Sequence, residues 1–224
     1  MDSMPGATIR LYFDFISPNA YLAWTQLPKL AEKHGASIEP VPVLFAALLE
    51  RHGRLGPAEI PVLMRWMWKN VLRKATLLGV PFNPPAHHPF NPLLALRLAS
   101  LPGDESRRRS VIDALFRAVW AHGIHVSEPE AVQRVLDASG LDGANLVAQA
   151  QRSEAKVRLR EQTDEALAKG VFGVPTMELN GEIFWGYDDF PHLELALAGR
   201  DPLDPERWGR WPAAFQASAT RSRK

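Results

Sequence analysis

The sequence contains no cysteine. This absence excludes disulfide bonds, thiolate metal sites and any redox chemistry that depends on a pair of thiols within the chain. A thiol that takes part in a reaction of this protein must therefore come from a ligand.

A strong net charge and long apolar runs are also missing. Lysine and arginine number 26 against 25 acidic residues, so the formal net charge is +1. A nearly neutral chain has no overall field that recruits nucleic acid or an anionic membrane, and we expect a small ligand. No apolar stretch is long enough to span a bilayer, and the N-terminus lacks a basic region followed by an apolar core. The sequence therefore predicts a soluble, cytoplasmic protein, with a mitochondrial address left open.

The chain opens with a predicted strand, helix and second strand. Residues 9–13 favour a strand, and Ser17-Pro18 combines a favoured helix N-cap with a proline at the first helical position, where a missing N–H costs nothing. The helix is expected to end near His34-Gly35. Residues 37–43 predict a second strand, whose prolines favour the edge of a sheet or a short element. With 224 residues, 46% of them hydrophobic, the chain can bury a substantial core around this unit.

Helical patterns dominate the middle of the chain, from residue 44 to about 168, with breaks at clusters of glycine and proline. One break, residues 80–92, is too rich in proline for a helix or a central strand and predicts an ordered, extended loop. Residues 176–185 then predict two short strands around an Asn-Gly turn, and a last helix is expected from about Asp189 to Leu197. The order of the elements indicates one sheet that carries a large helical insertion.

Three segments of the sequence, taken in order, resemble the motifs of one known family. They are Phe13-Asp14-Phe15-Ile16-Ser17-Pro18 followed by Tyr21-Leu22-Ala23, then Val171-Phe172-Gly173-Val174-Pro175-Thr176, and then Phe184-Trp185-Gly186 followed by Asp188. The family is that of the 2-hydroxychromene-2-carboxylate isomerases and kappa-class glutathione transferases, in the DsbA-like branch of the thioredoxin fold. The resemblance implies an α/β, thioredoxin-like fold with a large inserted all-helical subdomain. On this basis we expect a discontinuous thioredoxin-like domain of residues 8–43 and 169–200, an inserted helical subdomain of residues 44–168 and a C-terminal tail of residues 201–224.

Ser17 is the candidate catalytic residue. The resemblance implies that Ser17 occupies the position of the reactive cysteine in dithiol members, and that glutathione binds with its sulfur close to the Ser17 hydroxyl. A helix N-terminus carries partial positive charge and free N–H donors, which stabilise a thiolate and lower a thiol pKa from about 8.5 toward neutrality. No neighbouring base is evident, so we expect Ser17 to donate a hydrogen bond to the thiolate rather than act as a covalent nucleophile. The alternative is an ordinary N-cap.

Val174, Pro175, Asp188 and Arg54 complete the candidate glutathione site. A cis bond before Pro175 would leave the main-chain N–H and C=O of Val174 facing a ligand, and the resemblance implies that Val174 pairs with the cysteinyl backbone of glutathione. It also implies that Asp188 contacts the γ-glutamyl end. Arg54, which lies between two glycines, is a candidate for a glutathione carboxylate. The alternatives are a trans proline in an ordinary loop, a helix cap at Asp188 and a surface arginine.

Several positions depart from the family pattern. Asn19 stands where an aromatic residue commonly follows Ser-Pro, and Asp189 stands where a basic residue often follows the acidic one. The second change removes an expected carboxylate partner for glutathione. Leu63-Met64 covers a position expected to be lysine or arginine, which leaves Arg65 or Lys69 as substitutes. These departures leave the affinity for glutathione and the second substrate open.

Aromatic and histidine clusters are weaker candidates. Five aromatic side chains could line a cavity for an aromatic substrate, although the core is the favoured interpretation for most of them: Trp66, Trp68, Phe90, Trp120 and Trp185. No metal is expected, because no accompanying ligands show metal-site spacing beside the histidines His87, His88, His122 and His125. Neither a Ser-His-Asp arrangement nor a glycine-rich phosphate loop is recognisable.

Two functional hypotheses follow. The first, in the manner that the resemblance suggests, is a glutathione-dependent isomerase in which the bound thiolate adds reversibly to an unsaturated aromatic substrate of the 2-hydroxychromene-2-carboxylate type. A kappa-like glutathione transferase would instead release the conjugate. The second is a non-catalytic thioredoxin-like module that binds glutathione or peptides, which Asn19 and Asp189 motivate. Glutathione and a small aromatic compound are the expected partners, neither nucleic acid nor a membrane is, and a homodimer is expected from the resemblance alone.

Overall fold

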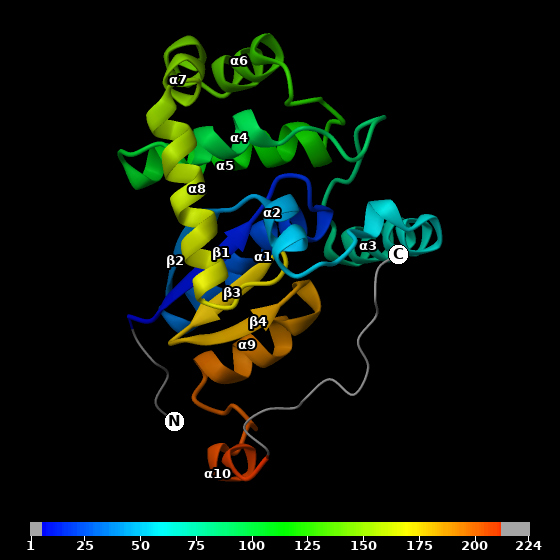
Figure 1. The fold of residues 1–224 in the computed structure, drawn as a ribbon, viewed down its shortest axis with the longest axis vertical. Helices are drawn as coiled ribbons and strands as arrows, with labels where there is room; N and C mark the ends of the chain where they lie inside the picture. Colours follow the sequence, from blue (N-terminus) through cyan, green and yellow to red (C-terminus); the bar gives the residue numbers. More distant parts are fainter. Residues whose placement is uncertain (1–5, 212–224) are drawn as a thin grey trace.

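A mixed sheet forms the centre of the protein in a computed structural model that describes residues 6–211. Its strands lie in the order β2-β1-β3-β4 (Figure 1). β1 (Thr8–Phe13) runs parallel to β2 (Ser37–Pro42) and antiparallel to β3 (Thr176–Leu179), which pairs with β4 (Glu182–Trp185). The prediction that β2 lies at an edge is confirmed, and the reason is that its prolines have no N–H to donate to a further strand.

The first helix follows β1 and returns the chain to β2. α1 (Pro18–His34) has Ser17 as its N-cap, and Gly35 ends it in the left-handed region at φ 63°. Glycine suits this position because it has no Cβ to clash in that conformation. The predicted strand-helix-strand unit is confirmed, with each boundary within about one residue of its expected place.

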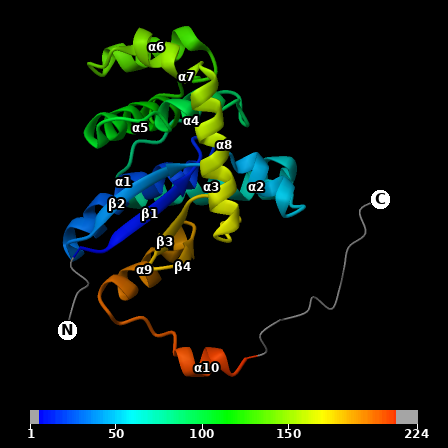
Figure 2. The same cartoon turned by 60° about the vertical axis from the view of Figure 1, so that its left-hand side comes forward.

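Helices fill the chain between β2 and β3. They are α2 (Phe45–Arg51), α3 (Pro61–Leu78), α4 (Leu93–Ala99), α5 (Glu105–Trp120), α6 (Pro129–Ala138), α7 (Gly143–Ala150) and α8 (Ser153–Ala168), with a short 3-10 turn, η1 (Pro57–Glu59), before α3. No helix or strand occurs within residues 80–92, as predicted. Figures 1 and 2 show α4 to α7 grouped beyond one end of the sheet, with α8 running back from them toward it. The fold is therefore thioredoxin-like with an inserted helical subdomain.

Different helices cover the two faces of the sheet. The odd-numbered side chains from Ile9 to Phe13 share one large core cluster with side chains of α1 and of α9 (Phe190–Leu197). Tyr12 belongs to a smaller cluster with Leu48 of α2 and Ala166 of α8. Alternate residues of a strand point to opposite faces, so the centre of the sheet is buried on both sides.

The last part of the chain follows the predicted hairpin. A 3-10 turn, η2 (Tyr187–Asp189), leads into α9, and a short helix that the sequence did not predict, α10 (Pro205–Gly209), lies beyond it. Residues 201–211 of the predicted tail are exposed, and residues 212–224 lie outside the described residues. None of the helices between residues 6 and 211 combines the length and the apolar character that crossing a membrane requires.

Candidate functional site

The end of β1 and the start of β3 lie side by side, because the two strands are antiparallel. Tyr12 pairs with Thr176 in this register. The Asp14–Ser17 loop, which follows β1, and the Gly173–Pro175 loop, which precedes β3, therefore leave the sheet at the same end of these two central strands. The topology brings two of the three sequence motifs together there.

Ser17 lies buried at the start of α1. Its Oγ accepts a hydrogen bond from the Ala20 amide at 3.2 Å, so its own O–H proton remains available for donation. Pro18 fills the first helical position, and the first turn of α1 carries no acidic residue. The positive end of the helix dipole is therefore not offset by a carboxylate of that turn. The N-terminus of α1 therefore favours a bound anion.

Asp14 holds the loop that leads to Ser17. Its Oδ1 accepts the Ile16 N–H and its Oδ2 accepts the Phe45 N–H at the start of α2, each at 3.0 Å. The carboxylate is 1% exposed. Burial raises the pKa of Asp14 from 3.8 to about 7, although the two backbone N–H groups act in the opposite direction. The Ser17 loop thus depends on a buried group that ionises near neutral pH.

Two side chains of the helical subdomain fix main-chain carbonyls of the same loop. Trp120 Nε1, at the end of α5, donates to the Phe15 carbonyl at 2.9 Å. His88 Nε2 donates to the Ile16 carbonyl at 2.9 Å, and the imidazole packs against Trp120 and Trp68. Burial lowers the pKa of His88, which favours a neutral ring with its proton on Nε2. The inserted subdomain therefore takes part in positioning Ser17.

The loop before β3 presents unpaired main-chain groups. The Val174–Pro175 peptide is cis. Thr176 Oγ1 donates to the Gly173 carbonyl at 2.8 Å, and the Gly186 amide donates to the Pro175 carbonyl at 2.8 Å. Within residues 6–211, neither the N–H nor the C=O of Val174 forms a hydrogen bond. Such groups can pair with the main chain of a peptide-like ligand.

Arg54 lies beside this loop on two aromatic rings. Its guanidinium carbon is 5.8 Å from the ring centroids of both Phe172 and Trp185. Trp185 also packs against Gly173, where an added Cβ would come within 2.5 Å of the indole Nε1. In the part of the chain that the structure describes, no acidic side chain pairs with Arg54. A guanidinium held on aromatic rings without a counterion is suited to bind a carboxylate.

Asp188 and Asp189 have different surroundings. The Asp188 side chain is 77% exposed, and its Oδ2 accepts a hydrogen bond from Lys74 Nζ of α3 at 2.8 Å. Asp189 Oδ2 accepts the Trp185 N–H at 2.8 Å, and its Oδ1 lies 2.9 Å from His192 Nδ1. Asp189 therefore holds the turn into α9, whereas Asp188 faces solvent beside a cation. η2 packs against α1, the helix for which Ser17 is the N-cap.

The other candidates from the sequence differ in their burial. Phe90 and Trp120 lie in the core and Trp68 packs against it, but Trp66 and Trp185 are 57% and 45% exposed, so the core interpretation is wrong for these two. The substitutes for the missing basic residue, Arg65 and Lys69, are exposed on α3. Among the described residues, no group of three or more potential ligands is arranged to hold a metal ion.

Four residues around the site were not found from the sequence in the roles that the structure shows: Asp14, His88, Trp120 and Lys74. Asp14 lies inside the first motif, so an acidic residue just before Ser-Pro was the available signal. His88 and Trp120 stand out in the sequence only as members of a histidine cluster and an aromatic set. Nothing in the sequence connects Lys74 with the Asp188 turn.

A hollow of about 1030 Å³ has none of these residues in its lining. It is bounded mainly by α1 and α5, and Tyr21, Lys29 and Arg117 are among the side chains that line it. It includes neither Ser17 nor Val174, so the candidate site rests on the geometry of the loops at the end of β1 and the start of β3.

Comparisons with known proteins agree with the fold. The family model of the DSBA-like thioredoxin domain matches residues 8–198. The chain is 31% identical over 191 residues to a 2-hydroxychromene-2-carboxylate isomerase of Pseudomonas putida, covering 84% of this chain and 93% of that protein. It is 28% identical over 206 residues to glutathione S-transferase kappa 2 of Caenorhabditis elegans, covering 85% and 91%. A solved structure of a 2-hydroxychromene-2-carboxylate isomerase superposes with a TM-score of 0.79 at 31% identity, covering 86% and 95%.

Proposed function

The chain belongs to the family of the 2-hydroxychromene-2-carboxylate isomerases and kappa-class glutathione transferases, among the DSBA-like thioredoxin domains, and on this premise we propose that it is a glutathione-dependent isomerase of 2-hydroxychromene-2-carboxylate type. The observation that carries the proposal is the position of Ser17 at the positive end of α1, in a chain that has no cysteine. A helix N-terminus can stabilise a thiolate, and because the chain has no cysteine, that thiolate would have to belong to a ligand.

The residues around Ser17 fit glutathione, a peptide-like thiol with two carboxylates and one ammonium group. Ser17 would donate its hydroxyl proton to the sulfur, and the unpaired N–H and C=O of Val174, beside Pro175, would pair with the cysteinyl main chain. Arg54 offers a cation for a carboxylate, and Asp188 offers an anion for the γ-glutamyl ammonium. The sulfur, the cysteinyl main chain, one carboxylate and the ammonium group of the ligand thus each have a partner of suitable character.

Bound glutathione supplies a thiol that adds reversibly to a conjugated carbon of the aromatic substrate or, in a transferase, leaves with it as a conjugate. The chain's own contribution is to favour the anionic form of that thiol, through the α1 N-terminus and the Ser17 hydroxyl. Each pKa unit gained in this way corresponds to about 1.4 kcal/mol. Ser17 itself is not a nucleophile in this proposal, because both Asp14 oxygens face main-chain N–H groups and no base contacts its Oγ among the described residues.

Calorimetry with glutathione, followed by two ultraviolet assays, tests the proposal. The assays follow the isomerisation of 2-hydroxychromene-2-carboxylate and the conjugation of glutathione to an electrophilic aryl halide. We expect binding together with glutathione-dependent isomerisation. Conjugation without isomerisation would assign the chain to the transferase alternative, and binding with neither activity would leave the non-catalytic module.

The proposal also includes a homodimer that acts on a small aromatic compound. It rests on the family relationship to proteins named as isomerases and kappa-class transferases. Sedimentation equilibrium should give twice the mass of the chain, and the mass of a single chain would contradict the dimer.

A further inference from the structure

Lys74 and Asp188 meet although they lie far apart in the chain. Lys74 Nζ donates to Asp188 Oδ2 at 2.8 Å and lies 5.8 Å from the centroid of the Tyr187 ring. The Lys74 side chain is 14% exposed, because its stem lies against the protein, while the Asp188 carboxylate faces solvent. The ammonium group of Lys74 is therefore held between a carboxylate and an aromatic ring at the edge of the candidate site.

Lys74 places a positive charge beside Asp188, where the sequence has Asp189 instead of the expected basic residue. The family pattern often has a basic residue there, directly after the acidic residue that corresponds to Asp188. In this chain, Asp189 is occupied by the Trp185 N–H and by His192, and it contributes no positive charge. Lys74 brings a cation to the neighbouring carboxylate from a different element, α3.

The amino-acid end of a γ-glutamyl group carries an ammonium and a carboxylate on the same carbon. A site for it needs an anion and a cation side by side. Asp188 Oδ1 has no hydrogen bond within residues 6–211, and a lysine ammonium that uses one N–H on Asp188 keeps two donors for another acceptor. The two side chains therefore bind each other, and in addition Asp188 can accept from an ammonium group and Lys74 can donate to a carboxylate.

We propose that Lys74 completes the γ-glutamyl subsite already proposed at Asp188, with Lys74 binding the α-carboxylate while Asp188 binds the ammonium. The assignment of Lys74 rests on the proposed use of glutathione. Lys74 does not compete with the ligand for Asp188, because each takes a different carboxylate oxygen.

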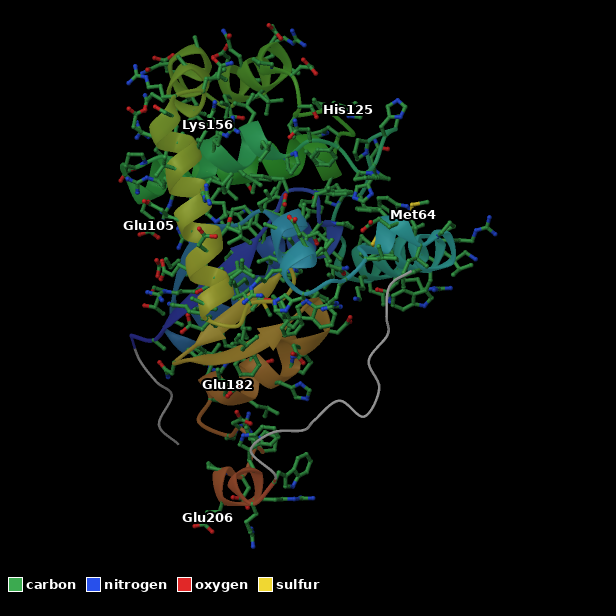
Figure 3. The ribbon with its side chains drawn as sticks, viewed as in Figure 1. Met64, Glu105, His125, Lys156, Glu182 and Glu206 are labelled. Carbon is green, nitrogen blue, oxygen red and sulfur yellow. The ribbon has the colours of Figure 1, made fainter. Side chains whose placement is uncertain are left out.

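Calorimetry on the full chain with two ligands tests the role of Lys74. The ligands are glutathione and 4-aminobutanoyl-cysteinylglycine, which keeps the ammonium but lacks the α-carboxylate. Lys74→Met keeps the length of the stem and removes the charge, and Lys156→Met is the matched control. Lys156 is exposed on α8, and Figure 3 shows it on the helical subdomain, far from α3 with its labelled Met64.

We expect Lys74→Met to weaken glutathione binding by about tenfold, as the loss of one charge-assisted hydrogen bond implies, and to leave the affinity for the analogue within about twofold. Lys74→Arg should retain most of the affinity, and Lys156→Met should bind as the wild type does. Asp188→Ala should weaken both ligands, because both carry the ammonium.

The outcomes separate the subsite from the proposed function. If the wild type binds glutathione and Lys74→Met binds it equally well or more tightly, the role of Lys74 is overturned and glutathione dependence stands. An equal loss for both ligands in Lys74→Met also overturns that role, since it shows an effect that does not act through the carboxylate. If the wild type binds no glutathione, both the subsite and the proposed function are overturned.

Discussion

The carboxylate of Asp14 accepts the backbone N–H of Phe45 at 3.0 Å and ties the loop before Ser17 to the first turn of α2. Its other oxygen accepts the Ile16 N–H of the loop itself. One buried side chain thus joins the start of the helical insertion to the loop that carries the proposed catalytic residue. Its ionisation affects both segments together.

We predict that Asp14 makes the stability of the protein fall as the pH rises. Its pKa is about 7 in the folded protein, above the ordinary 3.8, so between these values the folded state keeps a proton that the unfolded state has lost. The contribution is therefore fully favourable below the unfolded pKa and is lost as the pH rises toward and through 7. The full shift in pKa corresponds to a change in the free energy of unfolding on the order of 4 kcal/mol. Urea unfolding at about pH 5 and about pH 8 measures most of this change.

Asp14→Asn should flatten that pH dependence. Asparagine cannot ionise. Its amide oxygen can accept one of the two N–H groups that Asp14 accepts, but its NH2 group cannot accept the other, so we expect a lower stability with a weaker pH dependence. Asp113→Asn is the matched control, because it changes a carboxylate whose side chain is 54% exposed. The prediction for Asp14 is wrong if Asp14→Asn loses as much stability between the two pH values as the wild type does.

Ser17→Ala should reduce turnover by about a hundredfold or more while glutathione affinity changes little, because a donor aimed at a developing or stabilised anion acts mainly on the reaction. The variant also loses the N-cap hydrogen bond to Ala20, which costs about 1 kcal/mol of stability. Asp104→Ala is the control, because it removes the N-cap hydrogen bond of α5 and leaves Ser17 intact. Steady-state rates and calorimetry distinguish the two effects, and an unchanged rate in Ser17→Ala would remove Ser17 from the mechanism.

Arg54→Met should weaken the binding of glutathione by about tenfold with little change in kcat, since a carboxylate contact remote from the sulfur is made equally in the ground and transition states. The aliphatic side chain of methionine can still cover the rings of Phe172 and Trp185. Arg51→Met, on the exposed surface of α2, is the control. Equal affinity in the wild type and in Arg54→Met would show that Arg54 is a surface arginine.

Trp120→Phe should lower the free energy of unfolding by about 1–3 kcal/mol, because the Phe15 carbonyl loses its donor in a buried setting. Turnover should fall as well, since the carbonyl belongs to the loop that places Ser17. Trp66→Phe provides the control for stability, because Trp66 is exposed and its loss leaves no buried group unpaired. Urea unfolding of the two variants makes the comparison, and equal stability would contradict the structural role of Trp120.

The order and the limits of most elements follow from local signals in the sequence. Ser17-Pro18 starts α1, Gly35 ends it and Asn180-Gly181 turns the hairpin, because caps and turns depend on the backbone preferences of a few adjacent residues. The position of Ser17 at a helix start and the absence of a thiol are therefore evident from the sequence alone. The exposure of Trp66 and the helix α10 are not, because amphipathic patterns do not say which helix face finds a partner.

Only the tertiary structure decided which distant side chains meet at the site. Trp120 and His88 hold the Ser17 loop, and Lys74 reaches Asp188, across separations that no local pattern describes. The physical reason is that burial and charge pairing are set by the packing of whole helices on the sheet. Hydrophobic periodicity shows that a face is buried but not what covers it. For the same reason, no pattern in the sequence pairs Lys74 of α3 with Asp188 of η2, and only the tertiary structure showed that their side chains meet.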